Sequence, residues 1–203
     1  MPPEEAGAAE APAEVAPEEA APEAAPEAAA PASEEKANSI NINAFSIAFG
    51  TYGGNYERLF ANSHGLMVEG YFSSSSDGDT SATGGGGALG YRWHWSGKQN
   101  SGFLGAVAGF GMGSGDAVVD VNGARSTFTV NTTTIYAAAN IGYRWAWDFG
   151  LNITLRGGGG YANYGVSTDS EDANAEKAVE LVDDLLSWIP VYIDGELSIG
   201  FNF

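Results

Sequence analysis

The sequence predicts an all-β domain in which eight antiparallel strands, connected up and down, close into a barrel that crosses a membrane. Three observations predict this fold. The last strand alternates apolar and polar residues, the connections alternate between short and long, and two strand ends share a motif rich in Tyr and Trp. A closed barrel satisfies its backbone hydrogen bonds inside a membrane, and an even number of strands returns both chain ends to one side.

Residues 1–38 differ in composition from the rest of the chain and form a predicted tail. They hold seven of the eight prolines, ten glutamates, one lysine and no aromatic residue. Such a segment cannot bury enough apolar surface to offset the entropy lost on folding, so we expect it to be disordered and partly polyproline II. It shows no secretory signal peptide. We expect it to extend into the periplasm, where it is available to a partner.

The chain carries a formal net charge of −18 and no cysteine. An acidic protein repels nucleic acid, which excludes that class of partner. Without cysteine the chain has no disulfide, thiolate catalyst or Cys-based metal site. The glycine runs at 84–87 and 157–160 lack the Lys, Ser or Thr and the strand-to-helix context of a phosphate loop. We therefore expect no cofactor and no catalytic site.

The last strand, residues 190–203, shows the clearest pattern. Apolar residues occupy alternate positions, broken only by Gly195, while Asp194 and Glu196 lie on the opposite face. This period of two is that of a β-strand. The apolar face consists of Val191, Ile193, Leu197, Ile199, Phe201 and Phe203. A membrane barrel explains both faces, because its outer wall meets lipid and its inner wall is polar.

The connections define the remaining strands of the domain, residues 39–203. We predict strands near 39–49, 54–61, 65–73, 84–95, 102–113, 131–147, 150–163 and 190–203. Long polar links at 73–83, 114–131 and 163–189 are predicted to lie outside the cell. Within the last of these, helical spacing predicts a short helix near 174–189, ended by Pro190, which we expect to cap the barrel mouth. A phase shift near Ala44 indicates a bulge in the first strand.

Two strands end in nearly the same motif. LGYRWHW at 89–95 is repeated as IGYRWAW at 141–147. Both motifs run toward a short turn, which gathers six aromatic residues at one rim. They are Tyr91, Trp93, Trp95, Tyr143, Trp145 and Trp147. Tyr and Trp are enriched at membrane interfaces, so we predict an aromatic girdle; the alternative is the core of a soluble barrel.

Ionisable residues lie opposite the apolar stripes and are predicted to fill the lumen. An eight-stranded barrel is narrow enough for side chains to occupy its interior. The inward set is Glu57, Glu69, Arg92, His94, Arg144, Arg156, Asp194 and Glu196. Paired charges satisfy one another in a low-dielectric lumen, whereas lone charges are costly. We favour a polar core that holds the barrel in one register over a gate that opens when ion pairs exchange.

The chain resembles the eight-stranded outer-membrane barrels of Gram-negative bacteria, of the OmpA, OmpX and OmpW type. The resemblance covers residues 39–203 and is carried by the architecture, by ELSIGFNF at the C-terminus and by NYERLF at 55–60. It implies an assembly signal in the last strand. Glu196, Phe201 and Phe203 match that signal, whereas Ser198 stands where glycine is expected.

These observations favour a non-enzymatic protein of the bacterial outer membrane with a structural or surface-interaction role. Its expected partners are outer-membrane lipid, lipopolysaccharide and the barrel-assembly machinery. The alternative is a narrow, porin-like channel or a carrier for small, even apolar, solutes. A lipid-modifying enzyme and a soluble lipocalin-like binder are less favoured, because each requires a feature the sequence does not show: a clear catalytic constellation or an inward apolar face.

Overall fold

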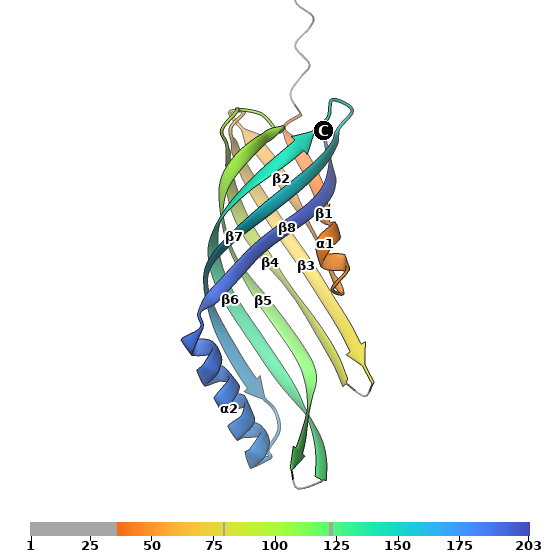
Figure 1. Ribbon diagram of the computed structural model, residues 1–203, viewed down its shortest axis with the longest axis vertical. Coiled ribbons are helices and arrows are strands. Elements are labelled where there is room, and N and C mark those ends of the chain that lie inside the picture. Colours follow the sequence, from red (N-terminus) through yellow and green to blue (C-terminus); the bar gives the residue numbers. More distant parts are fainter. Residues whose placement is uncertain (1–35, 79, 122–123) are drawn as a thin grey trace, which may run out of the picture. The chain divides into compact units, whose positions relative to one another are not determined.

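The computed structural model describes residues 36–78, 80–121 and 124–203. The predicted tail lies outside the described residues except for its last three. The domain is a closed barrel whose strands follow one another in chain order (Figure 1). Its elements are β1 (Asn38–Asn43), α1 (Ala44–Ile47), β2 (Thr51–Phe60), β3 (His64–Asp77), β4 (Thr80–His94), β5 (Ser101–Val121), β6 (Ala124–Ala146), β7 (Leu151–Thr168), α2 (Ala173–Trp188) and β8 (Val191–Asn202).

Every strand pairs antiparallel with its neighbours, which confirms the predicted eight-stranded up-and-down barrel. The wall closes where β1 pairs with β8, with Ile40 opposite Phe201 and Ile42 opposite Ile199. Asn38 and Phe203 exchange backbone hydrogen bonds of 3.0 and 2.9 Å at the end of this ladder. The C-terminal strand thus leaves no open edge there, which a membrane-spanning sheet requires.

The barrel is apolar outside and polar inside. In β8, Leu197 and Ile199 are about half exposed, while Glu196 and Ser198, which alternate with them, are buried. The same alternation appears in β6, where Ile141 is exposed and Arg144 is fully buried. This distribution is the reverse of that in a soluble protein, where large apolar side chains are the ones most often buried.

The first strand is shorter than predicted, and the expectation of a bulge near Ala44 is wrong. β1 ends at Asn43, and the single turn of helix α1 follows. The Asn43 side chain accepts a hydrogen bond from the Ser46 amide (3.4 Å), and the Ser46 hydroxyl donates to the Thr51 carbonyl (2.9 Å). These side-chain bonds to the backbone compete with strand pairing and stop the ladder.

Two of the predicted outer links are continuous strand rather than loop. The β3–β4 ladder continues until Asp77 pairs with Thr80, and the β5–β6 ladder continues until Val121 pairs with Ala124. The Ser and Thr residues of the β3–β4 extension are mostly exposed, so backbone pairing extends this hairpin without an apolar face. In the β5–β6 extension, Ala117, Phe128 and Val130 instead belong to an apolar cluster. Both hairpins extend past the barrel (Figure 1).

α2 lies where a helix was predicted, but it does not close the barrel mouth. Ala175 and Val179 are buried against Phe128 of β6, and the Asp183 carboxylate accepts a hydrogen bond from the Val166 amide of β7 (3.0 Å). A cavity at the barrel mouth is lined by residues of β3–β6, all within the described parts of the chain. None of these lining residues comes from α2. The helix therefore covers one wall of the mouth. Among the described residues no helix is long and apolar enough to span a membrane.

Candidate functional site in the barrel interior

Glu57 of β2 is the centre of the charged interior. Its Oε2 accepts hydrogen bonds from Arg92 of β4 (2.8 Å) and Arg144 of β6 (2.7 Å), while His94 Nε2 lies 2.9 Å from Oε1. All four side chains are at most 1% exposed. Gly65 on the neighbouring strand makes this arrangement possible, because a Cβ there would collide with the Glu57 carboxylate. One carboxylate thus joins three strands across the lumen.

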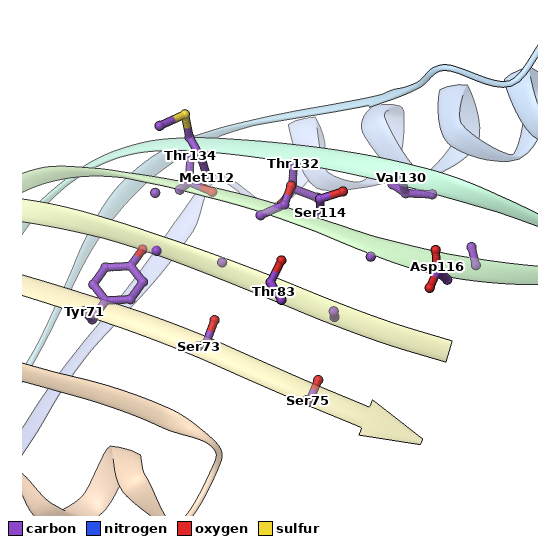
Figure 2. Close-up of a pocket in the computed structure, with 17 residues that line it drawn as sticks. Tyr71, Ser73, Ser75, Thr83, Met112, Ser114, Asp116, Val130, Thr132 and Thr134 are labelled. Carbon is purple, nitrogen blue, oxygen red and sulfur yellow. The ribbon is translucent and has the colours of Figure 1, made fainter. Parts of the chain in front are cut away.

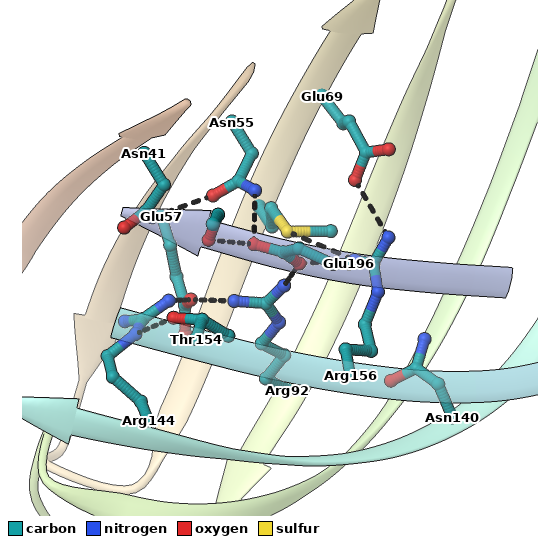
Figure 3. A network of polar contacts seen from close by, with 12 residues as sticks. Asn41, Asn55, Glu57, Glu69, Arg92, Asn140, Arg144, Thr154, Arg156 and Glu196 are labelled. Carbon is teal, nitrogen blue, oxygen red and sulfur yellow. Dashed lines mark hydrogen bonds and ion pairs between the residues drawn. The ribbon is translucent and has the colours of Figure 1, made fainter. Parts of the chain in front are cut away.

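Glu196 of β8 is the second centre. Its Oε2 accepts from Arg92 (2.6 Å) and lies 3.2 Å from Arg156 Nη1. Its Oε1 accepts from Asn55 (2.9 Å) and from Ser198 (2.6 Å). Arg92 therefore bridges Glu57 and Glu196 and connects the two halves of the interior (Figure 3). With two ion-pair partners and two neutral donors, the Glu196 carboxylate is fully satisfied.

Arg156 of β7 holds the outer part of the network. Its Nη2 donates to Asp194 (2.9 Å) and to Glu69 (3.1 Å), in addition to the Nη1 contact with Glu196. Asp194 also accepts from Asn140 of β6 (2.8 Å). The Glu69 side chain is 22% exposed, whereas those of Arg156 and Asp194 are 2% and 3% exposed. Glu69 thus lies at the edge of the network.

All eight charged residues predicted for the lumen lie on inward faces, and ion pairs join them into one network. Four of them are carboxylic acids and three are arginines, so the network carries one excess negative charge when His94 is neutral. Charges removed from water are stable only when they are paired and hydrogen-bonded. Each carboxylate of the network has at least one arginine partner. Arg92 Nε, Arg156 Nε and His94 Nδ1, by contrast, are buried without a hydrogen-bond partner among the described residues.

The predicted inward set did not include the neutral members of the site. Asn55, Asn140 and Thr154 occupy inward positions of period-two strands, so their alternation with apolar residues was a usable signal. Gln99 could not be found that way, because it lies in the β4–β5 turn and folds inward to accept from Arg144. Phe103 lies under the Arg92 guanidinium, 4.6 Å from ring centroid to Cζ. Because glycines flank Phe103, the alternation of apolar and polar residues in β5 could not be recognised from the sequence.

Three tyrosines lie beyond the charges toward the outer end. Tyr136 and Tyr192 stack with ring centroids 4.0 Å apart. The Tyr71 hydroxyl reaches Gly86 and Gly111, at both of which a Cβ would collide with it. Above Tyr71, a mouth cavity of about 540 Å³ is lined mainly by Gly, Ser and Thr of β3–β6 (Figure 2). The interior therefore changes from buried charges, through tyrosines, to an open polar cavity.

The residues predicted for the aromatic girdle face outward at the end opposite the mouth. Each of the six is 40–50% exposed. Tyr143 and Trp145 lie 4.9 Å apart by ring centroids, and the Tyr91 hydroxyl lies 2.6 Å from His64 Nδ1. Their rings therefore form part of the outer surface at this rim.

The residues matching the predicted assembly signal lie on both faces of β8. Glu196 is buried in the lumen, while Phe201 and Phe203 are 48% and 55% exposed on the outer face. Ser198, where the signal has glycine, is buried and donates to Glu196. A glycine would leave this carboxylate with one donor fewer, which is a physical reason for the departure.

The site offers hydrogen bonding and charge, with no arrangement for metal binding. Within the described residues no group of three or more His, Asp or Glu side chains is placed to hold a metal ion. His94 lies between Glu57 and Phe103, with ring centroids 5.4 Å apart in the latter pair. The charged network fills the lumen, in the half of the barrel away from the mouth cavity, with paired charges.

Comparison with known proteins finds similarity in structure and no match in sequence. No protein-family model matches the chain, and no curated protein matches its sequence. The crystal structure of Acinetobacter baumannii CarO2 aligns with a TM-score of 0.47 and 12% identity, covering 82% of this chain and 97% of that one. That of A. baumannii CarO gives the same TM-score and identity over 83% and 98%.

Proposed function

We propose that the protein is an integral outer-membrane β-barrel with a sealed lumen and a structural or surface-interaction role. One observation carries the proposal: the large apolar side chains of the barrel are exposed and its charged side chains are buried. In water this distribution would be strongly unfavourable, because each exposed Leu, Ile or Phe forgoes roughly 1.5–3 kcal/mol of burial. In a bilayer the same wall lies in its preferred medium.

The aromatic rim supports a definite orientation. Tyr and Trp prefer the boundary between hydrocarbon and water, so the rim of Tyr143 and Trp145 marks one edge of the belt. Both described ends of the barrel, Asn38 and Phe203, lie at this rim. In barrels of this type the chain ends and short turns face the periplasm and the longer connections face outward. We therefore assign the long hairpins and α2 to the cell surface.

The expected partners follow from these surfaces. The apolar belt contacts outer-membrane lipid, and the outer hairpins meet lipopolysaccharide. The exposed Phe201 and Phe203 on the last strand are available to the barrel-assembly machinery during insertion. We further propose that the barrel is of the OmpA type, which the strand count and the β1–β8 closure support.

The sealed lumen predicts that the refolded full chain adds no stepwise conductance to a planar bilayer. Arg92 and Glu57 cross the interior and are 1% and 0% exposed, which leaves them no free water contact. As a matched comparison, the double variant Arg92→Ala/Glu196→Ala removes a facing pair from the middle of the seal and should introduce conductance steps. Steady, ohmic steps from the unaltered chain would contradict a sealed lumen.

A second candidate function is a path for small solutes, and the mouth cavity is the observation that favours it. The cavity extends from the outer end to Tyr71, directly above the charged network. If the network rearranges, this cavity becomes the outer half of a narrow channel or of a carrier path. The conductance experiment separates the two functions.

A further inference from the structure

Glu69 differs from the other charged residues of the lumen in how it is compensated. Its Oε2 accepts from Arg156 at 3.1 Å, and no hydrogen-bond donor among the described residues reaches its Oε1. Figure 3 shows that second oxygen directed away from Arg156. Arg156 is itself shared with Asp194 and Glu196 at 2.9 and 3.2 Å. One guanidinium therefore pairs with three carboxylates. Of the two contacts that Arg156 Nη2 makes, the one to Glu69 is longer than the one to Asp194.

A polar cavity of about 190 Å³ adjoins Glu69. Tyr71 and Tyr192 contribute aromatic rings to its lining, and Asn55, Ser46 and Thr51 contribute polar groups. Its volume is about six times the ~30 Å³ that a water molecule occupies in the liquid, so it accommodates a solute of several heavy atoms. A carboxylate beside aromatic rings is the environment that recognises organic cations, through a charged hydrogen bond and cation–π contacts.

Tyr71 lies between this cavity and the mouth cavity. It is the one residue that lines both the mouth cavity and the cavity beside Glu69. The room left at Gly86 and Gly111 lets its hydroxyl extend across the lumen toward β5. The Tyr71 side chain therefore borders both cavities, and we expect a rotation of its ring to connect them.

We propose that Glu69 and the cavity lined by Tyr71 and Tyr192 bind a small organic cation carrying an ammonium group. The ammonium donates to the open Oε1 of Glu69, whose carboxylate shares Arg156 with two others. An anion is repelled by the carboxylates of Glu69 and Glu196, which both line the cavity. A neutral solute lacks the charge that pairs with Glu69. The site goes beyond the proposed function, because binding in it requires neither a bilayer nor a sealed lumen.

The test uses the full chain refolded in a zwitterionic detergent and titrated with ethylammonium chloride. Sodium chloride at equal ionic strength is the reference titration, and the readout is the backbone amide NMR signals of Gly70, Tyr71 and Tyr192. Ethylammonium should shift these signals saturably, whereas sodium should not. Equal shifts with both salts, or no shift with ethylammonium, would overturn the proposal.

Two variants identify the carboxylate. Glu69→Gln keeps the side-chain shape and removes the charge, so affinity for ethylammonium should fall roughly tenfold or more. Glu180→Gln, on the exposed side of α2, is the matched control and should bind as the unaltered chain does. Unchanged affinity in a folded Glu69→Gln variant refutes the assignment. If that variant does not fold, Tyr71→Phe replaces it: removal of the hydroxyl should alter the rate of ethylammonium exchange, and an unchanged rate counts against Tyr71 as the access point.

Discussion

Replacing Glu57 with glutamine should lower the free energy of unfolding by about 3–5 kcal/mol, because removing one partner of a buried ion pair leaves an uncompensated charge. Arg144 is the residue most affected. Glu57 is its only ion-pair partner among the described residues, and both side chains are fully buried. The remaining contacts of Arg144, with Thr154 and Gln99, are neutral. Chemical unfolding from lipid vesicles measures the loss.

A double-mutant cycle separates this loss from a general effect of substitution. Adding Arg144→Met to Glu57→Gln removes the stranded guanidinium, so the pair of changes should cost less than the sum of the single changes. Glu180→Gln is exposed on α2 and should leave stability unchanged. Additive losses, or no loss at all from Glu57→Gln, would show that Glu57 is not the centre of a buried network.

Introducing arginine at Ala139 should destabilise the barrel in a bilayer by roughly 2–4 kcal/mol, the cost of this charge at the midplane of a lipid-facing wall. Ala139 is exposed on the outer face of β6, four residues from Tyr143 at the aromatic rim and four from Ile135 toward the outer end. It is therefore placed near the middle of the apolar belt.

Thr133→Arg provides the matched control for that change. Thr133 is exposed on the same face of the same strand, beyond Ile135. Arginine there lies near or outside the interface, where the cost falls to about 0–1 kcal/mol. Unfolding from vesicles of one lipid composition compares the two variants. Equal stability of Ala139→Arg and Thr133→Arg would mean that this face does not meet the bilayer core.

The alternation of the sequence was sufficient to place strand faces. In β8 the unbroken period of two assigns Leu197 outward and Glu196 inward, and the structure has them so. A one-residue shift would reverse every side chain, so a long alternating run specifies its faces strongly. The same reasoning places Arg92 and Arg144 inward without knowledge of their partners. Those partners depend on strand register, which a single sequence does not encode locally.

The misplaced segments share the lack of an alternating signal. α1 depends on contacts of Asn43 and Ser46 that compete with the strand over only a few residues. The outer part of the β3–β4 hairpin consists mainly of Ser and Thr, and its pairing from Ser73 to Asp77 leaves no pattern of burial to read. Turn composition alone made these segments look like loops. The inward position of the Gln99 side chain could not be predicted either, because a turn residue has no face set by strand alternation.

The central claim is that lipid, and not protein, covers the outer face of the barrel. Refolding the full chain in plain buffer and in lipid vesicles, followed by electrophoresis with and without heating, tests it most directly. We expect aggregation in plain buffer and, from vesicles, a compact band that changes migration only after boiling, because a closed barrel resists unfolding by cold detergent. A monodisperse, folded monomer in plain buffer would contradict it.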